Sequence, residues 1–226
     1  MDGKHKSIGS NLALSNGLPC SGKPFTIPGP CGNLEVLVSC PEESQPNQVV
    51  VISHPHPLHG GTMQNKVVHT IAKTVNQVGL KAVRYNFRGV GASEGDYAEG
   101  VGEADDLVAI VDWVRSQIPD CAIWLAGFSF GGYVSLRAAD KVDAERLITV
   151  APAISFLEEK NISMPGCPWL LIQGMQDEVV PASSVIEWCG TLSRPPEIIT
   201  IEDTGHFFHG QLNVLRDTLI QYLSEE

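Results

Sequence analysis

The sequence predicts an α/β protein built on a mostly parallel, twisted sheet of about eight strands, with helices on both faces. Two observations carry this prediction. Short apolar runs alternate along the chain with longer segments of helical periodicity, and several of these runs are rich in Val, Ile and Leu without polar alternation. Strands that alternate with helices form right-handed βαβ units, and continuous apolar strands are typical of sheets covered on both sides.

The predicted strands are short apolar runs bounded by polar or turn-forming residues. No helical segment separates the first two runs, so we expect them to form an antiparallel hairpin at one edge of the sheet. The predicted strands are residues 24–28, 33–39, 49–53, 81–86, 122–127, 147–151, 169–173 and 198–201.

Helices are predicted where apolar residues recur at the spacing of a helical turn. In the first of these segments, Val67, Ile71 and Val75 fall on one face, and Gly79 ends the segment. The predicted helices are residues 66–78, 103–117, 130–139, 182–192 and 211–223.

Length and composition indicate one folded domain. The chain has 226 residues, of which 43% are hydrophobic and 18% are charged, and this is enough for one large core but short for two. The first residues are polar, rich in Gly, Ser and Asn, and without periodicity. We therefore expect residues 1–22 to form a flexible N-terminal arm and residues 23–226 to form a single domain.

Charge and cysteine usage limit the partners and the compartment. Lys and Arg number 15 against 26 Asp and Glu, which gives a net charge of −11 and argues against nucleic acid as a partner. No apolar run is long enough for membrane insertion or for a secretory signal, so we expect a cytoplasmic protein. The six cysteines form no Cys-x-x-Cys pair and are expected to be reduced, with a Cys20–Cys31 bridge left open as an alternative.

The strongest motif is Gly127-Phe128-Ser129-Phe130-Gly131, which lies between an apolar strand and a helix. G-x-S-x-G in that context is the pattern of a nucleophile elbow. The serine occupies a sharp turn, and the two glycines leave space where the backbone folds back on itself. The first turn of the helix also offers free N–H groups to a developing oxyanion. We therefore expect Ser129 to be a catalytic nucleophile.

A serine nucleophile needs a base, and the base needs an acid that orients it. Asp177 follows the strand predicted at residues 169–173, and His206 follows the one predicted at residues 198–201. Because ligand sites in such sheets gather at the carboxyl ends of the strands, both side chains are expected at the same edge. The chain order Ser129, Asp177, His206 is the order expected after a nucleophile elbow.

Neighbouring residues offer alternatives to two of these roles. Glu178 or Asp203 can replace the acid, and His209 can replace the base. We favour His206 as the base because Gly205, directly before it, permits a tight turn toward the site.

Two further segments complete a resemblance to a known superfamily. They are the loop His54-Pro55-His56-Pro57-Leu58-His59-Gly60-Gly61 and the segment Asn86-Phe87-Arg88-Gly89-Val90-Gly91-Ala92-Ser93-Glu94-Gly95. With the motifs above, they make the chain from about residue 24 onward resemble the α/β-hydrolase superfamily. Within it, the chain is similar to a branch of small, lid-poor bacterial serine hydrolases described as predicted or dienelactone-hydrolase-like. Dienelactone hydrolases carry cysteine at the position of Ser129, so their substrate is not implied.

The resemblance implies the α/β-hydrolase fold with a minimal or absent cap, a catalytic triad and an oxyanion hole. The oxyanion hole would use backbone N–H groups of Phe130 and of the loop after the strand at residues 49–53. Pro55 and Pro57 have no N–H to donate, which leaves His56 as the best candidate in that loop and Leu58 as the second. The connection at residues 152–168 is too short for a folded lid.

The function implied is that of a serine hydrolase that cleaves a carboxylic ester or thioester of a small to medium acyl group through an acyl-enzyme. No cofactor and no metal are implied. A peptidase or amidase with the same triad is the alternative among enzymes, and a non-catalytic scaffold is the alternative from another class. Five aromatic residues are expected either to border the open site or to belong to the core: Phe128, Phe130, Phe156, Phe207 and Phe208.

Two other patterns, one for a zinc site and one for a dinucleotide-binding loop, are disfavoured. His54, His56 and His59 have the histidine spacing of an H-x-H-x-D-H zinc motif, but Leu58 stands where the acid is expected. The glycines of residues 89–95 are wrongly spaced for a dinucleotide-binding loop, and no helix follows them at once.

Overall fold

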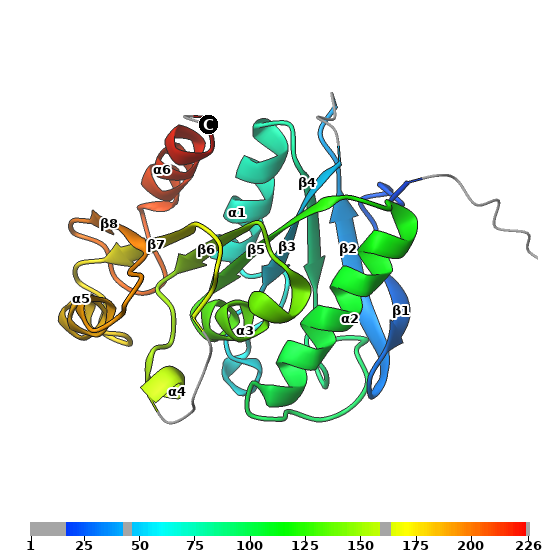
Figure 1. Cartoon of the computed structure of the whole chain (residues 1–226), viewed down its shortest axis with the longest axis horizontal. Helices are drawn as coiled ribbons and strands as arrows, with labels where there is room; N and C mark the ends of the chain where they lie inside the picture. Colours follow the sequence, from blue (N-terminus) through cyan, green and yellow to red (C-terminus); the bar gives the residue numbers. More distant parts are fainter. Residues whose placement is uncertain (1–16, 43–46, 159–163, 225–226) are drawn as a thin grey trace, which may run out of the picture.

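Eight strands form one sheet in the computed structural model, which describes residues 17–42, 47–158 and 164–224 (Figure 1). The strands are β1 (Phe25–Gly29), β2 (Gly32–Ser39), β3 (Gln48–Ser53), β4 (Lys81–Tyr85), β5 (Ala122–Phe128), β6 (Arg146–Val150), β7 (Trp169–Gly174) and β8 (Glu197–Ile201). Their order in the sheet is β1-β2-β4-β3-β5-β6-β7-β8. The pairs β1/β2 and β2/β4 are antiparallel and the others are parallel. The predicted fold class and its edge hairpin are confirmed.

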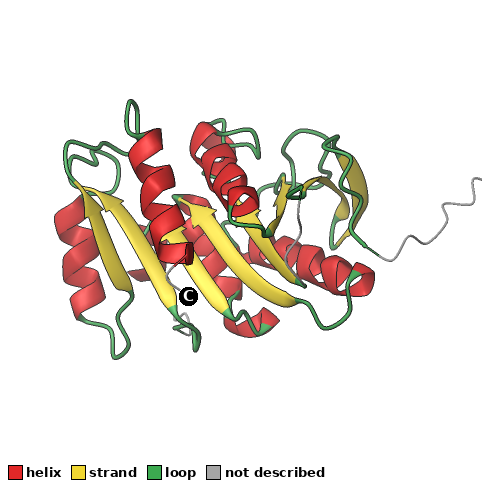
Figure 2. Ribbon diagram, turned by 90° about the horizontal axis from the view of Figure 1, so that it is seen from above, coloured by secondary structure: helices red, strands yellow, loops and turns green. Residues whose placement is uncertain are grey.

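Helices cover both faces of the sheet, as Figure 2 shows from above. They are α1 (Lys66–Gln77), α2 (Val101–Gln117), α3 (Phe130–Ala138), α4 (Ser155–Glu158), α5 (Ala182–Gly190) and α6 (Leu212–Ser224), with the short 3₁₀ helices η1 (Pro57–His59) and η2 (Asp140–Val142). None of the helices that the structure describes has the length and apolarity that a membrane crossing requires.

The sheet separates two hydrophobic cores. Alternate residues of β3 show this division, because Val49 and Val51 pack with α2 and α3, whereas Val50 and Ile52 pack with α1 and α6. Successive side chains of a strand point to opposite faces, so a strand covered on both sides is apolar at most of its positions. This explains why the central strands show no polar alternation in the sequence.

Local hydrogen bonds fix the starts of two helices. Asn65 caps α1, where its side-chain oxygen accepts the N–H of Val67 at 2.9 Å. Helix α2 begins two residues earlier than predicted, at Val101. The buried Glu103 carboxylate accepts the N–H groups of Ala98 and Gly100 at 2.8 and 2.7 Å, so the loop before the helix is folded back onto its first turn.

The segment before β1 differs from the expectation. Residues 1–16 of the predicted arm lie outside the described residues, but Leu18 is buried in the core. Cys20 forms a disulfide with Cys40, with their Cα atoms 5.6 Å apart. The expectation of reduced thiols is therefore wrong for this pair, and the bridge joins Cys20 to Cys40 rather than to Cys31, which is free. The packing of Leu18 holds the segment within reach of Cys40, which directly follows β2.

Candidate active site

Ser129 lies in the sharp turn between β5 and α3. Its backbone angles are φ 55° and ψ −120°, in a region that residues other than glycine rarely adopt. The turn is held by the Ser129 N–H, which donates to the Val150 carbonyl at 2.9 Å. A Cβ atom on Gly127 would collide with the backbone of Gly131, and one on Gly131 would collide with the backbone of Ser53. The sequence therefore forms the elbow because both flanking positions are glycine.

The structure brings Ser129, His206 and Asp177 together from three loops at the carboxyl edge of the sheet. Ser129 Oγ lies 3.0 Å from His206 Nε2, and His206 Nδ1 lies 2.8 Å from Asp177 Oδ2. With the Nδ1–H donated to the carboxylate, Nε2 is free to accept the serine proton. Their exposed fractions are 8%, 2% and 6%, so the hydrogen bonds compete little with bulk water.

Four hydrogen bonds orient the Asp177 carboxylate. Oδ1 accepts the N–H groups of Val179 and Val180 at 2.9 and 2.7 Å, while Oδ2 accepts Gln173 Nε2 at 3.1 Å in addition to the histidine. Gln173 is a site residue that the sequence analysis missed. Its signal was an amide side chain at the end of an otherwise apolar strand, four residues before the acid.

The alternative acids and base lie near the triad but outside its chain of hydrogen bonds. Glu178 is exposed and accepts the backbone N–H of His206 at 3.3 Å. Asp203 accepts Gln176 Nε2 at 2.9 Å. The His209 ring packs against Phe207. None of these three side chains is bonded to Ser129 Oγ or to the His206 ring in the part of the chain that the structure describes.

The buried side chain of His54 holds the loop after β3 in place. Its Nδ1 lies 2.7 Å from the Pro55 carbonyl oxygen, and its Nε2 accepts the N–H of Phe87 at 3.0 Å. Complete burial lowers the pKa of His54 to about 4, so the ring is neutral at pH 7. The side chain thus links the loop after β3 to the loop after β4, where Phe87 lies.

Two backbone N–H groups near Ser129 are considered as donors of an oxyanion hole, namely those of Phe130 and His56. Phe130 is the first residue of α3, and the first N–H groups of a helix have no partner within it. For the N–H of His56, no acceptor occurs among the residues that the structure describes. The start of the loop after β3 lies against the elbow, because a Cβ on Gly131 would meet the carbonyl groups of Ser53 and His54.

The three histidines of this loop have separate contacts instead of a common centre. Both ring nitrogens of His54 are hydrogen-bonded as described above. His56 Nδ1 accepts the N–H of Leu58 at 3.2 Å, and His59 stacks on the His56 ring at 4.6 Å between centroids. Within the described ranges, no three His, Cys, Asp or Glu side chains gather as metal ligands would.

The five candidate phenylalanines divide between core and surface. Phe128, Phe130 and Phe208 are fully buried, whereas Phe156 is half-buried and Phe207 is 43% exposed. Phe156 lies on α4, which is the only helix in the described part of the connection between β6 and β7. Residues 159–163 of that connection lie outside the described residues.

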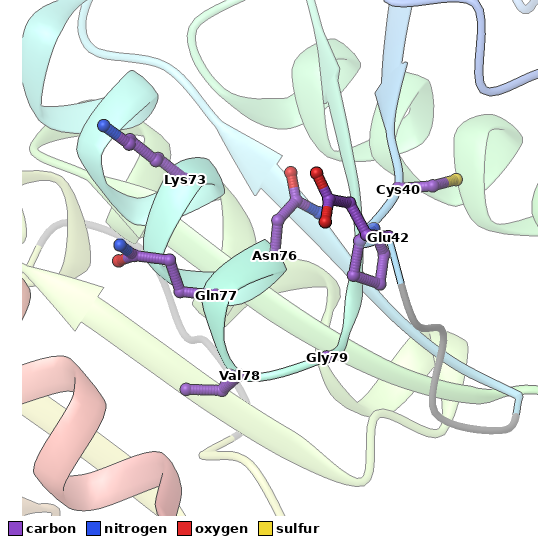
Figure 3. A pocket seen from close by; sticks show the side chains of 8 residues that line it. Cys40, Glu42, Lys73, Asn76, Gln77, Val78 and Gly79 are labelled. Carbon is purple, nitrogen blue, oxygen red and sulfur yellow. The ribbon is translucent and has the colours of Figure 1, made fainter.

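A separate pocket lies far from the triad. It has a volume of about 690 Å³ and is lined by Cys40, Glu42, Lys73 and Asn76, among others. Figure 3 shows Lys73 and Asn76 on α1 and Cys40 and Glu42 on the segment after β2. Gly79, also in its lining, precedes β4. The pocket therefore opens at the amino ends of the parallel strands, opposite the edge that carries Ser129.

The strand order, the elbow and the hydrogen-bonded serine, histidine and aspartate define an α/β serine hydrolase. The sequence pattern of the X-Pro dipeptidyl-peptidase (S15) family matches residues 32–166. The chain belongs to this family within the α/β-hydrolase superfamily. The match includes Ser129 but ends before Asp177 and His206.

Known proteins similar to the chain agree with this class. An uncharacterised protein of Rickettsia prowazekii is 30% identical over 206 residues, 86% of each chain. The structure of an α/β serine hydrolase homologue from Coxiella burnetii is 46% identical, with a TM-score of 0.86 over 89% of this chain and 97% of the other. The structure of an α/β serine hydrolase without lid from Xanthomonas campestris is 40% identical, with a TM-score of 0.86 over 92% and 96%.

Proposed function

We propose that this protein hydrolyses a carboxylic ester or thioester of a small to medium acyl group through an acyl-enzyme. The observation that carries the proposal is the continuous hydrogen-bonded chain Ser129 Oγ, His206 and Asp177, with distances of 3.0 and 2.8 Å. The short α4 in place of a lid favours access by small substrates. The esterase Pf2001 of Pyrococcus furiosus shares 18% identity at a TM-score of 0.74, and this likeness supports the fold alone.

In the first half of the reaction, Ser129 Oγ attacks the carbonyl carbon while its proton passes to His206 Nε2. Asp177 holds the resulting imidazolium through Nδ1–H. The carbonyl oxygen becomes an oxyanion that accepts the backbone N–H groups of His56 and Phe130. When the tetrahedral intermediate collapses, His206 Nε2–H protonates the leaving alcohol or thiol, and the acyl group remains on Ser129.

In the second half, His206 removes a proton from water, which attacks the acyl carbon. The same two backbone N–H groups receive the second oxyanion. Collapse returns the proton to Ser129 Oγ and releases the carboxylic acid, so the enzyme regains its starting state.

A fluorophosphonate probe tests the nucleophile directly. We expect the probe to label the wild-type protein and not Ser129→Ala, with the labelled peptide containing Ser129. The same two proteins are assayed on esters and thioesters of increasing acyl length, where only the wild type should turn over. Equal labelling of both proteins, or equal turnover by both, would remove Ser129 from the mechanism.

A peptidase is the second candidate, because the matching family is that of X-Pro dipeptidyl-peptidases. Amide cleavage uses the same residues but depends more on proton donation from His206 to the leaving amine. X-Pro p-nitroanilides and p-nitrophenyl esters distinguish the two functions. A higher kcat/KM on the anilides than on every ester would replace the ester proposal with the peptidase one.

A further inference from the structure

Four aromatic rings form a patch beside the elbow, which we call the aromatic patch: His56, Tyr97, Phe130 and Phe156. The His56 ring lies 4.8 Å from Phe130 and 5.1 Å from Tyr97 between centroids, and Phe156 lies 5.4 Å from Phe130. Phe130 is fully buried, whereas the other three are half-buried. Because Phe130 directly follows Ser129, the aromatic patch adjoins the elbow.

The Tyr97 hydroxyl is the polar group of this patch. The N–H of Leu58 donates to His56 Nδ1 at 3.2 Å, which makes Nδ1 an acceptor without a proton. Burial, together with nearby His59, lowers the pKa of His56, so the ring is neutral and its single proton is on Nε2. Nε2 lies 3.2 Å from Tyr97 Oη, and it must be the donor in this bond.

This tautomer leaves the Tyr97 proton available. The phenol oxygen accepts from His56 Nε2–H and keeps its own O–H for another acceptor. In the described part of the chain, no second partner is found for this hydroxyl. Burial raises the pKa of Tyr97, so the phenol stays protonated and remains a donor at neutral pH.

The loop that carries Tyr97 is held in place on both sides. Glu103 Oε1 accepts the N–H of Ala98, the next residue, at 2.8 Å. Arg88 forms a buried ion pair with Asp106 at 2.7 Å and donates to the Gly102 carbonyl at 2.7 Å. A donor on a loop fixed in this way is oriented before any substrate arrives, which lowers the entropy cost of using it.

Resting on the proposed function, we propose that the Tyr97 hydroxyl is a specificity-determining group that donates a hydrogen bond to an oxygen atom in the non-reacting part of the ester. The substrate class is therefore an ester with an ether, hydroxyl or carbonyl oxygen outside the scissile group. The half-buried rings of His56 and Phe156 contact the apolar atoms around that oxygen.

Matched ester pairs test this assignment. On the acyl side, p-nitrophenyl 3-methoxypropanoate is compared with p-nitrophenyl pentanoate. On the alcohol side, 2-methoxyethyl acetate is compared with butyl acetate. Each pair differs by one oxygen in place of a CH₂ group. The kcat/KM ratio within each pair is measured for the wild type, Tyr97→Phe and Tyr133→Phe, the last being a control that removes a fully buried hydroxyl from a ring packed on Phe130 and Phe156.

We expect the wild type to prefer the oxygen-bearing ester in at least one pair. Tyr97→Phe should reduce that preference by about five- to tenfold, the effect of one hydrogen bond. Tyr133→Phe should keep the wild-type ratio.

Two results would overturn the assignment of Tyr97. Identical ratios for wild type and Tyr97→Phe in both pairs would show that the hydroxyl does not contact the oxygen. An equal fall in kcat on both members of a pair would place its action at the reacting carbonyl instead. In either case ester hydrolysis by the wild type leaves the proposed function standing, whereas a wild type that hydrolyses none of the four esters contradicts the function and the inference together.

Discussion

Acidification is expected to destabilise this fold through His54. Its pKa is lowered from 6.5 to about 4 by burial, because the protonated ring would lose its hydration in the interior. As the pH falls below 6.5, the unfolded chain binds a proton on this residue before the folded chain does. The stabilisation is therefore complete above pH 6.5, is lost between pH 6.5 and pH 4, and changes no further below that range.

The magnitude follows from the shift in pKa. A difference from 6.5 to about 4 corresponds to about 3 kcal/mol in the free energy of unfolding at 1.36 kcal/mol per unit. About 1 kcal/mol of this is lost at pH 5.5, one unit below the unfolded value. Such a loss is a large part of the total stability of a typical domain.

Urea unfolding at several pH values between 7 and 4 measures this contribution when the wild type is compared with His54→Gln. The glutamine can accept the N–H of Phe87 but does not titrate, so the variant should lose less stability on acidification. At pH 7 the variant should be less stable than the wild type, because it lacks the stabilisation that the neutral imidazole gives the fold. Carboxylates that titrate in the same range do so in both proteins, and the difference between the two curves isolates His54. His209→Gln, the same change at an exposed histidine outside this loop, is the control for the substitution itself.

Parallel curves for the wild type and His54→Gln would refute this reasoning. They would mean that the folded protein accepts a proton on His54 as easily as the unfolded chain, which contradicts a buried, doubly hydrogen-bonded neutral ring.

Two further predictions concern the triad and the disulfide. Asp177→Asn should lower kcat by about four orders of magnitude, because the amide cannot hold His206 in the required tautomer, while urea unfolding shows a folded protein; near-normal turnover would move the acid to Glu178 or Asp203. Cys20→Ser should lower the free energy of unfolding under oxidising conditions by about 3 kcal/mol, the value expected when a bridge over a sequence separation of 20 is lost. A reductant should remove the difference between this variant and the wild type, and Cys31→Ser serves as the control; equal stability of Cys20→Ser and wild type without reductant would show that the bridge does not form.

The local sequence pattern was sufficient to predict most helices and strands, because each of them is determined mainly by its own residues. The strands on either side of Ser129 are apolar at successive positions, since both of their faces are buried. The predictions differ from the structure where contacts between residues distant in the sequence determine the conformation. Leu18 stands in a polar segment, and its packing in the core, together with the Cys20–Cys40 disulfide, attaches that segment to the domain. Helix α2 starts early because Glu103 binds backbone groups that precede it, which apolar periodicity does not record.

The candidate triad was within reach of sequence analysis for a topological reason. Parallel strands deliver their following loops to one edge, so chain order and position after a strand were enough to select Ser129, Asp177 and His206. Residues that act on the triad or its loops had no such signal. His54 and Phe87 are 33 positions apart, and His56 and Tyr97 are 41 apart. Their pairing depends on how the loops after β3 and β4 meet, which no local pattern specifies.

The histidine-rich loop shows how one spacing can support different chemistry. A metal site needs its ring nitrogens free and convergent, and here the ring nitrogens of His54 are used to hold the loop while those of His56 set the direction of a hydrogen bond. The first of these roles holds the loop that carries His56, and the second leaves the Tyr97 proton free for a ligand. Under the proposed function, the first role supports the backbone N–H that would bind the oxyanion, and the second supplies a donor to the non-reacting part of the ester. The His54→Gln stability curves test the role of His54 in this loop, and the Tyr97→Phe ester ratios test the role of the His56–Tyr97 hydrogen bond. The two tests are independent.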